Sequence, residues 1–342
     1  MVGADGQLPL PWLGAPLQEA LRTQRGHALL VHGPQGTGQY EMSLCLAQAW
    51  LCEGEPGAQK PCGHCASCHL ARAHSHPDLM VVVPEIDCER LGWPFLGEES
   101  KGKTPSKEIK VNEMRVIVAF AQSTSARGRG KVVVIHPAER MNAIAANTLL
   151  KTLEEPPGAA RFLLGCGAPD TLLPTIRSRC QAVALRLPPA DVATAWLAQH
   201  KVAQPDVMLA AAGGQPLEAL AWIEQGIDAV SWTCLPRQMA AGEAAPVAGW
   251  PLPLLVDALQ KLCHDAMCVA SGAPPRYFPP ASLPPAAALP ALVAWSKALR
   301  QAARHDEHPW NMPVMAESLA LQAAQALRPA APAKPPSVHS AG

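Results

Sequence analysis

Four cysteines lie within seventeen residues of one another and are spaced as metal ligands. Cys52, Cys62, Cys65 and Cys68 form the pattern C-x9-C-x2-C-x2-C. A two-residue gap lets a tight turn direct two thiolates at one ion, and four thiolates complete a closed tetrahedral zinc shell. Such a shell leaves no position open for catalysis, so the pattern predicts a structural zinc module over residues 52–68.

The spacing leaves two alternatives, a site in which a nearby histidine replaces one cysteine and a segment without metal. The histidines in question are His64, His69, His74 and His76. The chain has eleven cysteines, an odd number that excludes complete disulfide pairing and fits a reducing compartment. The seven outside the cluster are expected to be small apolar core residues.

A glycine-rich turn, GPQGTGQY, runs from Gly33 to Tyr40 and keeps the glycine spacing of a phosphate-binding P-loop. After Gly38, a working P-loop carries a Lys that reaches the phosphates and a Ser or Thr hydroxyl that binds Mg²⁺. Gln39 and Tyr40 stand there instead, so the cation and the compact hydroxyl are both missing. The turn is predicted to be a degenerate P-loop; a plain glycine-rich turn is the alternative.

The acidic partners of a P-loop are missing as well. P-loop ATPases place a metal-binding Asp at the end of a neighbouring strand. Here the apolar run 131–136 ends in His136 and is followed by Pro137. Losses at two separate places predict that the chain does not hydrolyse ATP. They leave open whether the turn still holds a nucleotide weakly.

Short apolar runs separated by helical segments predict a parallel α/β sheet with both faces covered. The expected strands are 28–32, 79–83, 131–136, 161–165 and 181–185. Residues 142–155 are expected to form a helix, capped by Asn142 and ended by Pro156. Residues 87–110 show no clear period and are interpreted as a surface loop.

Beyond residue 187 the strand pattern gives way to Ala- and Leu-rich helical sequence, interrupted at Gly213-Gly214 and around 236–253. We therefore expect an α/β domain over 1–187, helical domains over 188–230 and 231–327, and a disordered tail over 328–342.

The composition excludes several classes of protein. Lys plus Arg and Asp plus Glu number 28 each in 342 residues, which argues against holding nucleic acid by bulk charge. No apolar run approaches the ~20 residues of a membrane span, and the N-terminus lacks the pattern of a signal peptide. We expect a cytoplasmic protein without membrane contact.

Two further motifs complete a resemblance, NTLLKTLEEPP over 147–157 and TIRSRC over 175–180. Together with the altered P-loop and the four cysteines, they resemble the clamp-loader family of bacterial DNA polymerase III, and within it the δ′ subunits. The match runs over most of residues 20–190. It implies an AAA+ P-loop-type parallel sheet domain with an inserted zinc module, a small helical lid and an all-α C-terminal collar.

The resemblance also implies a role for Ser178 and Arg179. In clamp loaders the arginine of the SRC motif reaches the γ-phosphate of ATP on a neighbouring subunit, as a finger supplied in trans. A local salt bridge is the alternative that the residues alone favour, and Arg177 is the nearest rival. Leu217 stands where active modules carry a nucleotide-contacting arginine in the lid.

The implied function is that of a non-hydrolysing stator in a hetero-pentamer with γ/τ and δ subunits, which loads the sliding clamp on primed DNA. An active γ/τ-type ATPase is the first alternative, and Gln39 and His136 count against it. A zinc-dependent nucleic-acid-binding module is the second; segment 52–76 is neither basic nor aromatic, which disfavours it. A small-molecule kinase would need an intact P-loop.

Overall fold

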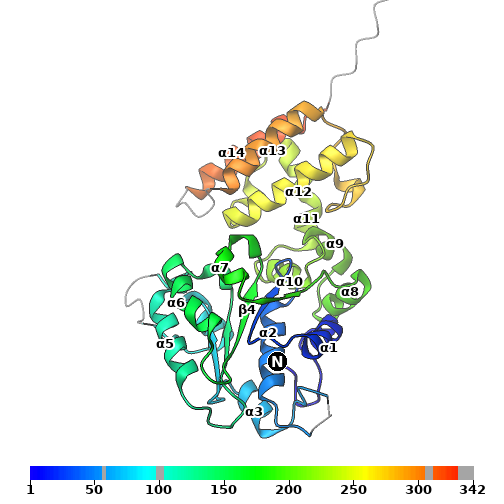
Figure 1. Cartoon of the computed structure of the whole chain (residues 1–342). Helices are drawn as coiled ribbons and strands as arrows, with labels where there is room; N and C mark the ends of the chain where they lie inside the picture. Colours follow the sequence, from blue (N-terminus) through cyan, green and yellow to red (C-terminus); the bar gives the residue numbers. More distant parts are fainter. Residues whose placement is uncertain (56–58, 98–103, 305–310, 330–342) are drawn as a thin grey trace, which may run out of the picture. The chain divides into compact units, whose positions relative to one another are not determined.

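The computed structural model describes residues 1–55, 59–97, 104–304 and 311–329, which divide into two compact units. The first unit comprises 1–196 together with 215–218, and the second comprises 197–214 and the described residues from 219 onward (Figure 1). The expected division into three domains stays a prediction. Most of the expected tail, residues 330–342, lies outside the described residues.

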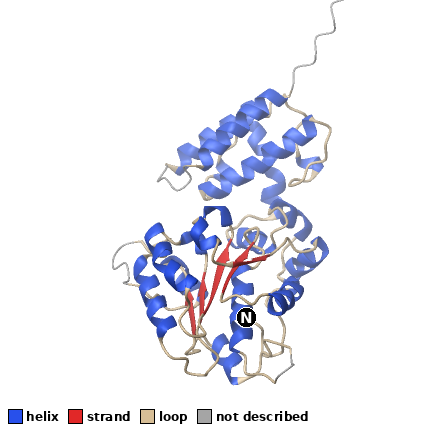
Figure 2. Ribbon diagram, in the orientation of Figure 1, coloured by secondary structure: helices blue, strands red, loops and turns tan. Residues whose placement is uncertain are grey.

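A five-stranded parallel sheet forms the centre of the first unit (Figure 2). Its order is β2-β3-β4-β1-β5, so the chain crosses over between strands through helices. Each strand lies within one residue of an expected apolar run, which confirms the predicted α/β class. The strands are β1 (Ala28–His32), β2 (Leu79–Val82), β3 (Val132–Ile135), β4 (Arg161–Cys166) and β5 (Gln181–Ala184).

Helices cover both faces of this sheet, which is why its strands are almost wholly apolar. Leu30 and Phe162 point to one face, where Met114 and Leu149 pack against them from α5 and α6. Helix α2 contacts β1, β3 and β4 from the other face, and α1 packs on α2 (Figure 1). These helices are α1 (Gly14–Thr23), α2 (Gln39–Leu51), α5 (Val111–Gln122) and α6 (Ala143–Glu154).

Helix α6 forms as its sequence predicts. The Asn142 side chain accepts a hydrogen bond from the backbone N–H of Ala145 at 2.9 Å, which caps the first turn. Leu149 and Leu153 are buried on its inner face. The helix ends at Glu154, two residues before Pro156, because proline disfavours a helical residue before it.

The interpretation of residues 87–110 as a surface loop is wrong at both ends. Helix α4 (Glu85–Leu91) begins after Pro84, carries acids in its first turn and ends at Gly92, whose φ of 70° suits glycine. At the other end Ile109 is fully buried and bridges to Met141. Residues 98–103 lie outside the described part of the chain.

The second unit is helical, and its core contains Trp232, Leu259, Leu292 and Leu319. Helix α11 continues through Pro236 to Ala241, so the interruption expected from 236 begins only at Gly242. None of the helices in the described residues has both the length and the apolar character that a membrane crossing requires.

The helices not yet named are α3 (Ala66–Arg72), α7 (Pro174–Arg177), α8 (Ala190–Gln199), α9 (Pro205–Ala211), α10 (Pro216–Glu224), α11 (Ala229–Ala241), α12 (Leu252–Ala270), α13 (Leu289–Ala303) and α14 (Met312–Ala326). Short 3-10 turns occur at Pro11–Leu13, Ala138–Arg140, Pro169–Thr171, Ala245–Val247 and Pro280–Ser282.

Candidate functional site

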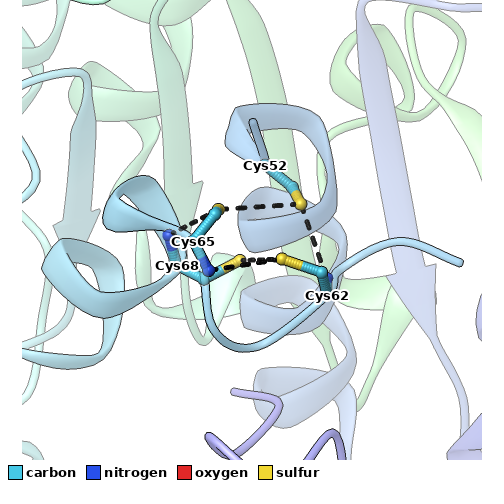
Figure 3. Close-up of side chains that lie close together, drawn as sticks. All are labelled: Cys52, Cys62, Cys65 and Cys68. Atoms are coloured by element: carbon cyan, nitrogen blue, oxygen red, sulfur yellow. Dashed lines mark hydrogen bonds between the residues drawn. The ribbon is translucent and has the colours of Figure 1, made fainter. Parts of the chain in front are cut away.

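The four clustered cysteines bring their sulfurs together (Figure 3). Cys52 caps the end of α2, and Cys65 caps the start of α3, whose first turn holds Cys68. All four sulfurs lie within 4.8 Å of one another, and the Cys52–Cys65 and Cys62–Cys68 pairs are 3.9 Å apart. A tetrahedral site with Zn–S bonds of ~2.3 Å has sulfur–sulfur edges of ~3.8 Å, so the arrangement fits such an ion.

Backbone N–H groups point at these sulfurs and favour their thiolate form. Cys52 Sγ accepts from Gly54 and Cys62, Cys62 Sγ from Cys65, and Cys65 Sγ from Cys68, each at 3.4 Å. Burial raises the pKa of Cys62, but the N–H groups of Cys65 and His64 outweigh it and lower that pKa to about 7. The backbone therefore favours the thiolate of Cys62, whereas burial raises the pKa of Cys52 and Cys68.

No histidine belongs to this cluster among the described residues. His76 is buried and bonded to Ser67 Oγ at 2.8 Å, while His74 stacks on Trp93 with ring centroids 3.7 Å apart. His64 Nδ1 lies 2.8 Å from the Cys62 carbonyl oxygen. The geometry thus favours the four-cysteine set over the histidine-substituted alternative.

The other cysteines follow the expectation of core residues with one exception. Cys45, Cys88, Cys166 and Cys263 are buried, and Cys180 and Cys268 are half-buried, but Cys234 is exposed on α11. The apolar positions of α11 that face the core lie elsewhere on the helix, at Trp232 and Leu235.

A buried carboxylate, Asp78, ties the cysteine segment to the sheet. It accepts the backbone N–H groups of Ala126 and Arg127 at 2.8 Å and pairs with Lys131 at 3.0 Å. The Arg127 guanidinium in turn binds Glu53, next to the first cysteine, at 2.7 and 2.8 Å. Burial raises the pKa of Asp78, but these N–H groups and Lys131 outweigh it and lower the pKa to about 2.

This pKa shift predicts a pH-dependent stability. A folded pKa below the ordinary value of about 3.9 gives stability that is present above pH 4 and is lost as the pH falls towards 2. We expect Asp78→Asn to lower the free energy of unfolding at pH 7 by about 2 kcal/mol, and the difference from the parent to close between pH 4 and 2.

Urea unfolding followed by circular dichroism across this pH range measures the effect. Asp170→Asn is the matched control, because the Asp170 side chain is 94% exposed and its loss should change stability little at any pH. A gap between parent and Asp78→Asn that stays constant down to pH 2 would contradict the assignment.

The turn between β1 and α2 requires both glycines of its P-loop spacing. A Cβ on Gly33 would lie 2.3 Å from the carbonyl oxygen of Leu185, and Gly38 has a φ of 103°. The Gln39 side chain is buried and its Nε2 donates to the carbonyl oxygens of Gly33 and Pro34 at 2.7 and 2.6 Å. The amide is thus bonded to the turn itself.

Tyr40 and His136 carry no charge at neutral pH. The Tyr40 hydroxyl accepts a hydrogen bond from Trp93 Nε1 at 2.5 Å, and burial raises the pKa of Tyr40 to about 12. His136 directly follows β3, and its ring centroid lies 5.2 Å from that of Tyr40. Burial lowers the pKa of His136 to about 4. Trp93 lies in the segment interpreted as a surface loop, but it is only 6% exposed.

A cavity of about 740 Å³ opens beside this turn. Gln39, Tyr40 and His136 line it, at the places where a P-loop ATPase has a cation, a metal-binding hydroxyl and an acid. Leu217 closes one side, and its backbone N–H donates to Gly36 O at 3.2 Å. The cavity therefore presents a neutral side chain at each of these three positions, and its other lining residues include Arg90, Lys107 and Arg140.

Arg179 follows the short helix α7 and is held by an acid that the sequence analysis did not single out. Its Nε donates to Glu154 Oε1 at 2.7 Å, and its Nη2 contacts the same oxygen. Its Nη1 donates to the carbonyl oxygen of Thr175 at 2.8 Å and lies 3.3 Å from Ser178 Oγ. Glu154 belongs to the LEEPP motif, so the sequence did mark this residue. Nothing in the sequence indicated that it contacts Arg179.

The neighbours of Arg179 have separate partners. Arg177 pairs with the exposed Asp170 at 3.2 Å. Cys180 is half-buried against the core beneath α6, and burial raises its pKa to about 12. In the SRC motif, the serine thus contacts the arginine, the arginine lies at the surface and the cysteine packs inward.

A second group of metal-ligand types occurs on α12, formed by His264, Asp265 and Cys268. The buried Asp265 accepts the three backbone N–H groups of residues 276–278 at 2.7 to 2.9 Å. These bonds account for both carboxylate oxygens and make Asp265 an anchor for the loop after α12.

A parallel sheet with a glycine-rich turn after its first strand, an inserted cluster of four cysteines and a helical second unit define an α/β protein with a helical C-terminal part. A family model described as "DNA polymerase III, delta subunit" matches residues 14–189. The chain belongs to the DNA polymerase III δ′ subunit family, as the sequence motifs predicted.

Individual relatives agree with this assignment. The chain is 37% identical to the DNA polymerase III subunit δ′ of Pseudomonas aeruginosa, over 71% of this chain and 74% of that protein. It is 30% identical to the δ′ subunit of Escherichia coli, over 73% and 76%. It is also 33% identical to the γ/τ subunit of Mycobacterium tuberculosis, over 62% of this chain but 35% of that protein.

Proposed function

We propose that this chain is the non-hydrolysing stator of a clamp loader. It would assemble with γ/τ and δ subunits in a hetero-pentamer that loads the sliding clamp on primed DNA in the cytoplasm. Arg179, supported by Ser178, would act in trans on ATP bound by a neighbouring γ/τ subunit. The observation that carries the proposal is the buried Gln39 amide, which occupies the lysine position and is bonded to Gly33 and Pro34.

The proposed loss of hydrolysis follows from the three side chains at the positions that carry the chemistry of an active P-loop. A triphosphate brings several negative charges that a P-loop neutralises with Lys and Mg²⁺. Gln39 offers no charge, the Tyr40 hydroxyl is engaged by Trp93, and His136 is neutral and lacks the oxygens that Mg²⁺ prefers. Loose nucleotide binding through backbone groups stays compatible with this geometry.

Two properties of Arg179 support its role as a finger, namely the permanent charge of its guanidinium and its position at the surface. A guanidinium keeps its charge at any physiological pH and presents several donors to phosphate oxygens. The Arg179 side chain is 29% exposed, next to a short surface helix. Arg177 is the more exposed arginine at 44%, but a single 3.2 Å contact to an exposed acid leaves it less ordered.

We further propose that the helical sequence after residue 187 acts as a lid over 188–230 and a collar over 231–327. The helices from α8 to α14 support this proposal, since no strand follows β5 in the described part of the chain.

Restoring the missing cation tests the nucleotide site. The isolated chain should show no ATP turnover above a blank. Gln39→Lys with Tyr40→Thr should raise the affinity for Mg-ATP about ten-fold by calorimetry, because one charge-assisted contact is worth about 1.5 kcal/mol. Gln18→Lys adds the same charge at an exposed position of α1 that does not line this cavity, and it should leave the affinity for Mg-ATP unchanged. Hydrolysis by the unmodified chain would remove the proposal.

Removing the guanidinium tests the finger. Arg179→Ala should leave the thermal unfolding temperature nearly unchanged, but lower ATP turnover by the reconstituted loader at saturating clamp and primed DNA. An arginine finger raises the rate of hydrolysis roughly 10³–10⁵-fold at the site it serves. Hydrolysis at that site should therefore be lost, while the other sites continue to hydrolyse ATP. Arg177→Ala is the matched control and should keep full turnover. Equal turnover in parent and Arg179→Ala would exclude the finger.

We propose that the four cysteines hold a structural zinc ion. Soft thiolates suit Zn²⁺, and the sulfur separations of 3.9 Å suit a tetrahedron. A closed shell of this kind would add folding energy to a segment with few apolar residues, because the ion is bound only in the folded state.

Zinc content measures this assignment. Elemental analysis of the purified protein should find one zinc per chain, and Cys65→Ser should lose most of it with a lower unfolding temperature, since a hydroxyl is a poor ligand. Cys234→Ser replaces an exposed cysteine outside the cluster and should retain the metal. Full zinc content in Cys65→Ser would rule out this ligand set.

A further inference from the structure

One ion pair joins two motifs that are separate in the sequence, LEEPP and SRC. Glu154 is the last residue of α6, and Arg179 lies 25 positions later, beyond β4 and α7. Both partners belong to the first compact unit. The contact fixes the arginine that the proposed function depends on.

The contacts restrict Arg179 on two sides and leave its far end open. Nε and Nη2 point at the single oxygen Glu154 Oε1, and Nη1 points at Thr175 O. A guanidinium has five N–H groups, and Nη2 carries two of them. One Nη2–H therefore has no partner among the described residues, on the end of the side chain away from its own Cα.

Helix stability does not explain an acid at this position. The C-terminus of a helix carries partial negative charge, so Glu154 at the end of α6 is electrostatically unfavourable there, and Glu155 adds a second negative charge. The cation of Arg179 offsets this cost. The acid is better explained by the arginine that it holds than by the helix that carries it.

The backbone that carries Glu154 is fixed. Leu149 and Leu153 are buried on the same helix, and the cap at Asn142 secures its other end. A long arginine side chain otherwise samples many rotamers and loses that freedom when it meets a ligand. Holding it beforehand reduces the entropy lost in forming the interface.

We propose that Glu154 is a positioning residue that orients the Arg179 guanidinium towards the γ-phosphate held by the neighbouring subunit. The inference rests on the proposed arginine finger. The Glu154 side chain is 48% exposed, so water screens its charge and the guanidinium keeps its attraction for phosphate.

Two substitutions at Glu154 separate orientation from charge. Glu154→Ala removes the acceptor, whereas Glu154→Gln keeps an oxygen of the same reach and removes the charge. Glu155→Ala is the matched control, because it removes an exposed acid from the same helix end. Each variant is reconstituted into the full loader with γ/τ, δ, clamp and primed DNA, beside the parent and Arg179→Ala.

We expect Glu154→Ala to lower kcat at the site that Arg179 serves by roughly three- to ten-fold with KM for ATP unchanged, because a misplaced group costs transition-state stabilisation. Glu154→Gln should stay close to the parent, and so should Glu155→Ala. Unfolding temperatures of the chains should agree within experimental error, since an exposed ion pair contributes little stability.

The outcomes distinguish this inference from the proposed function. If Arg179→Ala lowers turnover but Glu154→Ala does not, the finger stands and the positioning role is excluded. Higher turnover in Glu154→Ala would also overturn it, by showing that Glu154 restrains the arginine. If Arg179→Ala turns over ATP as the parent does, both proposals fall.

Discussion

The hydrogen bonds of the Gln39 amide are the constraint on which the rest depends. A P-loop turn must be held in a tight curve around an anion, and in an active enzyme a lysine contributes charge there. In this chain a neutral amide bonds to two carbonyl oxygens of the turn and is buried. The turn is therefore held by an uncharged side chain, so its curve does not depend on a cation at position 39.

The β-strands and the helix over 143–154 could be predicted because the pattern of residues within each segment determines its structure. Parallel strands buried on both faces are short apolar runs, and each of these runs is bounded by turn residues. The segment after Val83 was misread, because α4 is only seven residues long and its helical period is too short to detect. The burial of Trp93 depends on Tyr40, 53 positions away, which no local pattern reveals.

The candidate sites divide in the same way. The cysteines are close in sequence, and their spacing alone predicted a cluster that the structure brings within 4.8 Å. Asp78 and Glu154 were missed because their partners are distant in the sequence, in the segment between α5 and β3 and in the segment between α7 and β5. An acid whose role is to hold a distant cation looks, in sequence, like any surface acid.

The residues around Gln39 and the residues that hold Arg179 are separate groups in this structure. None of the described residues that hold Arg179, namely Glu154, Thr175 and Ser178, lines the cavity beside the P-loop turn. Substitutions at Gln39, Tyr40 and His136 therefore leave the arginine and its support untouched. Under the proposed function, this separation would let a subunit lose its own phosphate site without weakening the group that it offers to a neighbour. Because the sheet positions both regions, we expect substitutions in its buried core to disturb both of them.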